Sequence, residues 1–134
     1  DGGAHVGFIL DAGYPTWLIS YWSVKKKVFS MEETIRRLTS DTANAAGLSD
    51  RGVLKTGLKA DVNIIDWKNV GSSDPFMTQD LPAGGKRLMQ TTQGYVATIV
   101  SGKITYQNGV STKERPGGLV RSVKDSQKIF AYTS

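Results

Sequence analysis

The chain has 134 residues, of which 39% are hydrophobic and 22% charged, and its formal net charge is +5. This length fits one ordinary domain or two pieces of larger ones. The chain has no cysteine, which excludes a disulfide framework, and its one histidine is too few for the usual ligand set of a zinc site within the chain. The basic residues are scattered, and the run Lys25-Lys26-Lys27 is typical of a solvated loop, so we expect no nucleic acid as a partner. No apolar run reaches the roughly 18 residues of a membrane span, so we expect no membrane as a partner.

The segment after the N-terminal glycines predicts a loop and then a regular element. Glycine and proline over residues 11–15 indicate the loop. The apolar residues 16–23 are compatible with a buried helix or with a strand, and periodicity does not distinguish the two. Pro15 favours a helix start at this point.

Two helices are predicted next, each from its terminal residues. Ser30 and Glu33 form a capping box, in which the Ser30 hydroxyl accepts from the Glu33 amide while the Glu33 carboxylate reaches back. Asp41 is expected to cap a second, shorter helix. Gly47 is expected to end that helix, because glycine is common at the first left-handed position past a helix.

Strand signals replace helix signals from Gly52 onward. Residues 62–65 carry β-branched and apolar side chains and predict a strand, whereas residues 68–86 are rich in Gly, Ser, Asp and Pro and predict a loop. Further strands and tight turns are then predicted in alternation: a strand within residues 94–102, the turn Ser101-Gly102, a strand over residues 103–107 and the turn Asn108-Gly109.

The order of these elements, helices first and strands second, indicates two structural contexts. The boundary falls between Gly52 and Gly57, which are expected to act as turn points. We therefore assign residues 1–56 and residues 57–134 to different structural units.

Five stretches follow one another along the chain: "DGGAHVG" from Asp1, "SMEETIRRLTSDTANAAGL" from Ser30, "DRGVLKTGLKADVNIID" from Asp50, "DLPAGGKRLMQTTQGYVATIVSGK" from Asp80 and "STKERPGGLVR" from Ser111. In this order and spacing they resemble the C-terminal portion of the amidohydrolase superfamily. Within that superfamily they are most similar to the branch of N-acyl-D-amino-acid deacylases (D-aminoacylases).

The resemblance implies an α/β fold. Members of this family fold as a (β/α)8, or TIM, barrel with a β-sandwich built from both chain ends. Residues 1–56 would then form the C-terminal end of the barrel, mostly helices, and residues 57–134 would add strands to the composite β-sandwich, followed by a tail. As an isolated fragment, the same residues would look α+β.

The resemblance also assigns roles near the N-terminus. Asp1 matches the catalytic aspartate of the last barrel strand, which acts as general base and then general acid beside a metal-bound water. His5 and Tyr14 are candidate substrate-binding residues. The competing interpretations are a frayed terminus for Asp1 and a loop histidine for His5. Tyr14, Trp17 and Trp22 line a pocket for an apolar acyl chain or, as is common for aromatic residues, belong to the core.

Three other polar residues receive structural roles. Asp61 and Asp66 flank the strand over residues 62–65 and are conceivable as a catalytic carboxylate pair. The resemblance places them in the β domain, where they would cap turns. Arg115 is expected to anchor the C-terminal segment through a carboxylate or a carbonyl.

The function that the resemblance implies is hydrolysis of linear C–N amide bonds in small-molecule N-acyl amino acids, of the D series in the branch named above. Zinc or another divalent metal is implied for the intact parent, where Asp1 is a possible ligand, and none is expected in this chain because the family's metal-binding histidines have no counterpart here. The alternative is a non-catalytic module whose exposed apolar faces associate into a homo-oligomer. A cytoplasmic location is expected.

Overall fold

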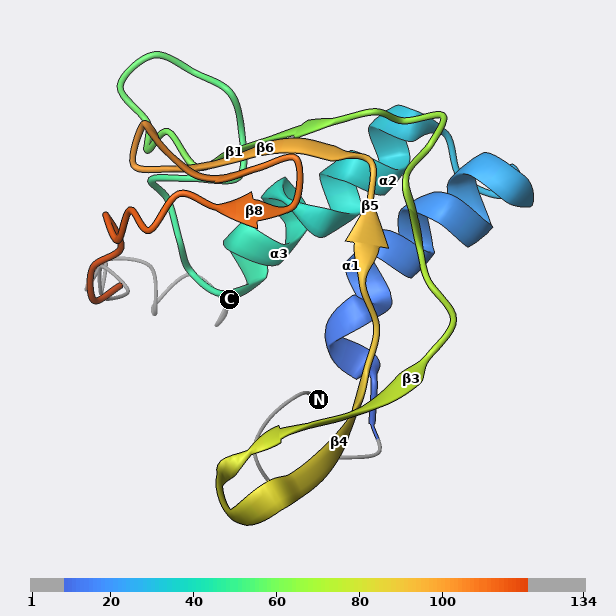
Figure 1. Cartoon of the computed structure of the whole chain (residues 1–134). Helices are drawn as coiled ribbons and strands as arrows, with labels where there is room; N and C mark the ends of the chain where they lie inside the picture. The colour runs from blue at the N-terminus through green and yellow to red at the C-terminus, as the bar shows by residue number, and fades with distance from the viewer. Residues whose placement is uncertain (1–8, 121–134) are drawn as a thin grey trace, which may run out of the picture.

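The computed structural model describes residues 9–120 (Figure 1). Helical elements come first: η1 Asp11–Gly13, α1 Tyr14–Trp17, η2 Leu18–Lys25, α2 Met31–Leu38 and α3 Ser40–Ala45. The strands follow, with one short helical turn among them: β1 Val62–Ile65, β2 Gly71–Ser72, β3 Phe76–Leu81, η3 Pro82–Gly84, β4 Gly85–Met89, β5 Thr92–Gln93, β6 Tyr95–Val100, β7 Lys103–Gln107 and β8 Val110–Ser111. The described chain is therefore α+β, as expected for the fragment, and the barrel itself stays a prediction.

The apolar segment after Pro15 is helical, which decides between the two interpretations of its sequence. Pro15 lies in the first turn of α1, where its missing N–H leaves no hydrogen bond unmade. The helix then widens into the π-helix η2, whose end is marked by the bond from the Lys26 amide to the Tyr21 carbonyl at 2.8 Å. Among the described residues, no helix has the length and apolar character needed to cross a lipid bilayer.

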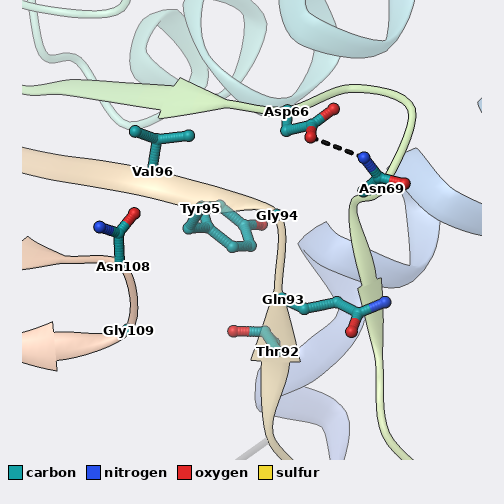
Figure 2. Close-up of a pocket in the computed structure, with 9 residues that line it drawn as sticks. All are labelled: Asp66, Asn69, Thr92, Gln93, Gly94, Tyr95, Val96, Asn108 and Gly109. Atoms are coloured by element: carbon teal, nitrogen blue, oxygen red, sulfur yellow. Dashed lines mark hydrogen bonds between the residues drawn. The ribbon is translucent and has the colours of Figure 1, made fainter.

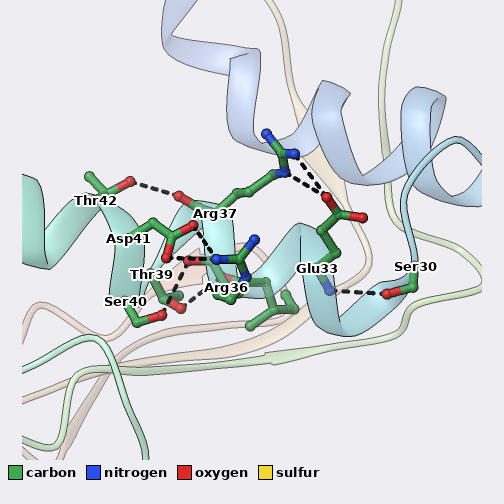
Figure 3. A network of polar contacts seen from close by, with 9 residues as sticks. Ser30, Glu33, Arg36, Arg37, Thr39, Ser40, Asp41 and Thr42 are labelled. Atoms are coloured by element: carbon green, nitrogen blue, oxygen red, sulfur yellow. Dashed lines mark hydrogen bonds and ion pairs between the residues drawn. The ribbon is translucent and has the colours of Figure 1, made fainter.

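The start of α2 confirms half of the capping box (Figure 3). The Glu33 amide donates to the Ser30 hydroxyl at 3.1 Å. The Glu33 carboxylate does not reach back, because it accepts from Arg37 one turn further on, at 2.8 Å. The Thr34 side chain is fully buried and donates to the Ser30 carbonyl at 2.7 Å, so the first turn is held from inside as well as outside.

The predicted cap of the second helix is wrong. α3 begins at Ser40, so Asp41 lies inside its first turn and pairs with Arg36 at 3.0 Å (Figure 3). The Thr39 hydroxyl donates back to the Ile35 carbonyl at 2.7 Å, which carries the chain from α2 into α3 with a single intervening residue. No separate cap is needed where one helix runs almost directly into the next.

Gly47 ends α3 as predicted. Its φ is +69°, and its amide donates to the Asn44 carbonyl at 3.1 Å. The Leu48 amide donates to the Ala43 carbonyl at 2.8 Å. These two bonds form a Schellman motif, which favours glycine because the left-handed conformation strains residues with a Cβ.

The main sheet is antiparallel, with the strand order β1-β6-β7-β8. The strands predicted over residues 62–65, 94–102 and 103–107 are confirmed as β1, β6 and β7. Both predicted turns are confirmed, because Ser101-Gly102 has φ values of +50° and +77° and Asn108-Gly109 has +48° and +79°, the signs that a type I′ hairpin turn requires.

The prediction of a loop over residues 68–86 is wrong. This part of the chain contains β2, β3 and the start of β4, with η3 at the tip of the β3–β4 ribbon. The strands pair across the ribbon, with Phe76 opposite Met89 and Met77 opposite Leu88. Local turn chemistry dominates the composition here, whereas the strands form because β3 pairs with β4, the next strand in the chain, and β2 pairs with β5.

The core of the described residues is small. Its buried hydrophobic side chains are Ile19, Ala43, Val70 and Ala97, which come from both the helices and the strands. Within residues 9–120, sixteen large hydrophobic residues are exposed, Leu54 and Val110 among them. With so few buried apolar side chains, caps and turns contribute a large share of the local stability.

Replacing Ser30 by alanine tests the cap. The Ser30→Ala variant loses the acceptor for the Glu33 amide, and we expect the free energy of unfolding to fall by about 1 kcal/mol. Urea unfolding followed by far-UV circular dichroism measures the change. Ser49→Ala, at an exposed loop serine, is the matched control, and an equal loss in both variants would contradict the capping role.

Candidate functional site

Two of the three predicted site residues, Asp1 and His5, lie outside the described residues. The third, Tyr14, begins α1 with 63% of its surface exposed. Its assigned role therefore remains a prediction. The structure places Tyr14 on the surface.

The neighbouring aromatic side chains pack on one another. Trp17 stacks on Tyr21 with ring centroids 4.7 Å apart, and Trp22 meets both rings edge-on. The ammonium groups of Lys25 and Lys26 lie 5.8 and 5.5 Å from the centroid of the Tyr21 ring, within cation–π range. The aromatic residues thus form a cationic surface cluster, with Trp17 48% exposed, instead of a buried core.

A hydrogen bond joins this helical region to the strands. The Thr16 hydroxyl and the Tyr95 hydroxyl lie 2.8 Å apart although 79 positions separate them in the sequence. Thr16 is only 4% exposed, so its hydroxyl has little access to water as an alternative partner. This bond ties α1 to the first residue of β6.

Tyr95 also lines a hollow at the end of the main sheet (Figure 2). The hollow has a volume of about 570 Å³. Its lining comes from the turn after β1, the β5–β6 junction and the β7–β8 turn: Asp66, Asn69, Thr92, Gln93, Gly94, Tyr95, Val96, Asn108 and Gly109. The lining therefore offers three carboxamides, two hydroxyls and one carboxylate, together with the Tyr95 ring and a valine.

Gly94 allows the two sides of the hollow to approach. Its φ is +84°, and a Cβ at this position would lie 2.5 Å from the Val70 Cα. The Gly94 carbonyl accepts from the Asp66 amide at 2.7 Å. A side chain here would push apart the two backbone segments that form the wall.

Asp66 is held as a turn residue. Its carboxylate accepts from the Asn69 side-chain amide at 2.7 Å, seen in Figure 2, and from the Lys68 backbone amide at 3.2 Å. The pKa of the Asp66 carboxyl lies below its ordinary value of 3.8, chiefly because the Asn69 side chain donates to it. The backbone amides of Asn69 and Lys68 lower this pKa further. The hydrogen bonds that lower this pKa are the ones that close the turn after β1.

Asp61 has a comparable structural role at the other end of β1. Its carboxylate accepts from the Ser101 amide at 2.8 Å and from Arg51 at 3.3 Å, so it braces the β6–β7 turn. The turn-capping roles expected of Asp61 and Asp66 are confirmed. Arg115 donates to the carbonyl of its neighbour Glu114 at 3.0 Å, a local contact that ties it to no other element in the described part.

The lining of the hollow is polar and includes the Asp66 carboxylate. None of its lining residues is cationic, so no group there would pair with the carboxylate of an amino acid. Within residues 9–120, no group of three or more His, Cys, Asp or Glu side chains is placed to hold a metal ion. The hollow lies where the turn after β1, the β5–β6 junction and the β7–β8 turn meet.

Sequence reasoning missed Tyr95, Gly94 and Asn69. The spacing of Asp66 and Asn69 is typical of an Asx-type turn, and this signal was available locally. The link between Thr16 and Tyr95 was not, because no local pattern specifies a contact across 79 positions.

Comparison with known proteins finds one matching family and several relatives. The amidohydrolase family model matches residues 3–106, a range that includes His5 and starts after Asp1. Dihydroorotases of Lactobacillus acidophilus and Bacillus cereus are 34% and 39% identical over 96 and 89 residues, each alignment covering 63% of this chain and 20% of the relative. An N-acyl-D-aspartate deacylase of Alcaligenes xylosoxydans is 29% identical over 93 residues, covering 69% of this chain and 17% of the relative. The chain thus spans about a fifth of the length of these relatives, and no solved structure matches it.

Removing one hydroxyl tests the link between α1 and β6. In Tyr95→Phe the nearly buried Thr16 hydroxyl loses its partner, and we expect the free energy of unfolding to fall by about 1–3 kcal/mol. Tyr106→Phe is the matched control, since Tyr106 is 47% exposed in the same sheet. Urea unfolding of both variants measures the difference. A Tyr95→Phe variant as stable as the control would show that the Thr16–Tyr95 bond does not stabilise the fold.

Asn69→Ala tests the electrostatics of the hollow. Loss of the Asn69 donor should raise the pKa of the Asp66 carboxyl toward 3.8. The pKa of Asp66 is lower in the folded state than in the unfolded state. The hydrogen bonds to its ionised carboxylate therefore stabilise the fold above pH 3.8, and this stabilisation is lost as the pH falls through the folded-state pKa. Carboxyl carbon chemical shifts followed by NMR between acidic and neutral pH give the midpoint. Asn108→Ala, at another hollow residue, should leave the midpoint in place.

Proposed function

The chain belongs to the amidohydrolase family, and from this premise we propose that it is the C-terminal part of a metal-dependent hydrolase that cleaves C–N amide bonds. The observation that carries the proposal is the family match over residues 3–106, which is most of the chain. The five stretches that resemble the family lie mainly within the same range and support it.

Within this class we favour linear amide bonds of N-acyl-D-amino acids as the substrate. The N-acyl-D-aspartate deacylase relative supports this choice, and its alignment covers more of the chain than those of the two dihydroorotases. A dihydroorotase-type activity is the second candidate, because the dihydroorotases are 34% and 39% identical against 29% for the deacylase.

Asp1 is the residue to which we assign the proton transfers. Its carboxylate would accept a proton from water as the oxygen attacks the acyl carbon, and deliver a proton to the nitrogen as the C–N bond breaks. His5 and Tyr14 are the proposed substrate contacts. The family is generally metal-dependent, and since residues 9–120 supply no ligand group, zinc or another divalent ion in the intact protein would depend on other residues.

The described residues support this chemistry by position. α1 follows the segment that carries Asp1 and His5, and the Thr16–Tyr95 bond fixes α1 against β6. The β domain would then support the segment that carries the catalytic residues. Holding reacting groups in place lowers the entropic part of the activation barrier.

The alternative is a structural module without activity of its own. It is favoured by the many exposed hydrophobic residues and by the absence of a metal-binding group among residues 9–120. The two proposals differ in a simple assay, because only the hydrolase requires Asp1.

The Asp1→Asn variant tests the hydrolase proposal in the longest natural polypeptide that contains this chain. We expect its kcat toward N-acetyl-D-aspartate to fall by about 10²- to 10⁴-fold, because the amide cannot accept a proton, while the fold is kept. Asp74→Asn, at an exposed loop carboxylate, is the control and should keep the parental rate. Hydrolysis of dihydroorotate, assayed in parallel, distinguishes the second candidate. Parental activity in Asp1→Asn would refute the assignment.

A further inference from the structure

Asn108 and Gly109 form the two-residue turn between β7 and β8 (Figure 2). Gln107 and Val110 pair across the turn, and the Asn108 backbone amide donates to the Val96 carbonyl at 2.9 Å. The Asn108 side chain and the Gly109 backbone amide make no hydrogen bond within residues 9–120. Neither group has to break a hydrogen bond to another described residue before it reacts.

An asparagine followed by glycine loses its side-chain amide by reaction with the next backbone nitrogen. The Gly109 nitrogen gives its proton to the solvent and attacks the Asn108 Cγ, so that a C–N bond forms. The Cγ–Nδ2 bond then breaks, and ammonia leaves with a proton taken from water. Water opens the resulting cyclic succinimide at one of its two carbonyl carbons, which gives aspartate or isoaspartate. The net reaction consumes water and releases ammonia, and nothing is oxidised or reduced.

Gly109 distinguishes Asn108 from the other asparagines of the chain. Glycine has no Cβ to block the approach of its nitrogen, and its backbone rotates freely. Asn63 and Asn69 each precede a β-branched residue, whose side chain crowds the attacking nitrogen. Asn44 lies inside α3, where the helix fixes the backbone. The sequence therefore makes Asn108 the most reactive of the four asparagines.

The turn has to open before the nitrogen can reach the Asn108 Cγ, and the structure opposes this opening only weakly. β8 has two residues, lies at the edge of the main sheet and pairs with β7 alone. Val110 in β8 is 70% exposed, so opening the turn costs little buried apolar surface. Segments with few buried contacts open locally at a free energy well below that of global unfolding.

We propose that Asn108 is a site of spontaneous deamidation, which converts a neutral carboxamide of the hollow into a carboxylate. Asn108 and Asp66 both line the hollow, and none of the lining residues is cationic. The product therefore places a second negative charge in the hollow with no cation in its lining to balance it. Isoaspartate also lengthens the main chain by one methylene, so the two-residue turn no longer fits the pairing of Gln107 with Val110. The modification does not depend on the hydrolase activity.

Peptide mapping of the longest natural polypeptide that contains this chain tests the proposal. After incubation at mildly alkaline pH, trypsin places each of the four asparagines on a peptide of its own, covering residues 38–51, 60–68, 69–86 and 104–113. We expect the 104–113 peptide to change from the amide to the acid mass about tenfold faster, or more, than the other three, because their asparagines precede residues with a Cβ. The product should separate into two chromatographic forms, and one of them should coelute with the same peptide from Asn108→Asp.

Two controls distinguish the reaction at the folded turn from general amide loss. Asn108→Gln keeps a carboxamide but needs a larger, slower-forming ring, so its 104–113 peptide should keep the amide mass. A synthetic peptide of residues 104–113 gives the rate without the fold. Equal rates at all four asparagines would overturn the proposal. An amide that persists at Asn108 of the polypeptide while the synthetic peptide deamidates would also overturn it, because the folded turn would then be protective.

Discussion

The hydrogen bond between Thr16 and Tyr95 is the contact on which the arrangement of the molecule depends. It joins α1 to β6 across 79 positions and places the Tyr95 ring in the wall of the hollow at the sheet's end. The net contribution of this hydrogen bond to stability is small, because both hydroxyls would bond to water in an unfolded chain. Once Thr16 is buried, however, losing the partner leaves an unpaired group, and this penalty gives the pairing its specificity.

The same region shows how a polar hollow can be structural. Asp66, Asn69 and Gly94 satisfy one another's hydrogen bonds and bring the turn after β1 against the start of β6. The Asp66 carboxylate accepts from the Asn69 side chain and from the Lys68 amide, and these bonds close the turn and lower the pKa of the carboxyl. The proposed catalysis is assigned to Asp1 because the stretch "DGGAHVG" resembles the family's segment that begins with the catalytic aspartate.

Local signals in the sequence foretold a good part of the structure. The Ser30 cap, the Gly47 helix end and the Ser101-Gly102 and Asn108-Gly109 turns each depend on residues within a few positions of one another. The errors have a common cause. Asp41 was expected to cap a helix that instead continues almost directly from α2, and residues 68–86 were expected to be a loop although they pair as strands with β4 and β5. In both cases contact with another element decided the conformation: α2 leads almost directly into α3, and strand pairing orders residues 68–86.

The sequence by itself determined the family, the α+β order of elements and the conformation of the tight turns, since composition, short motifs and backbone preferences are written into consecutive residues. Only the tertiary structure decided that Tyr95 meets Thr16 and that the β3–β4 ribbon stands clear of the main sheet. Those outcomes depend on which distant segments come into contact, and pairing of that kind is set by packing across the whole chain instead of by any local preference.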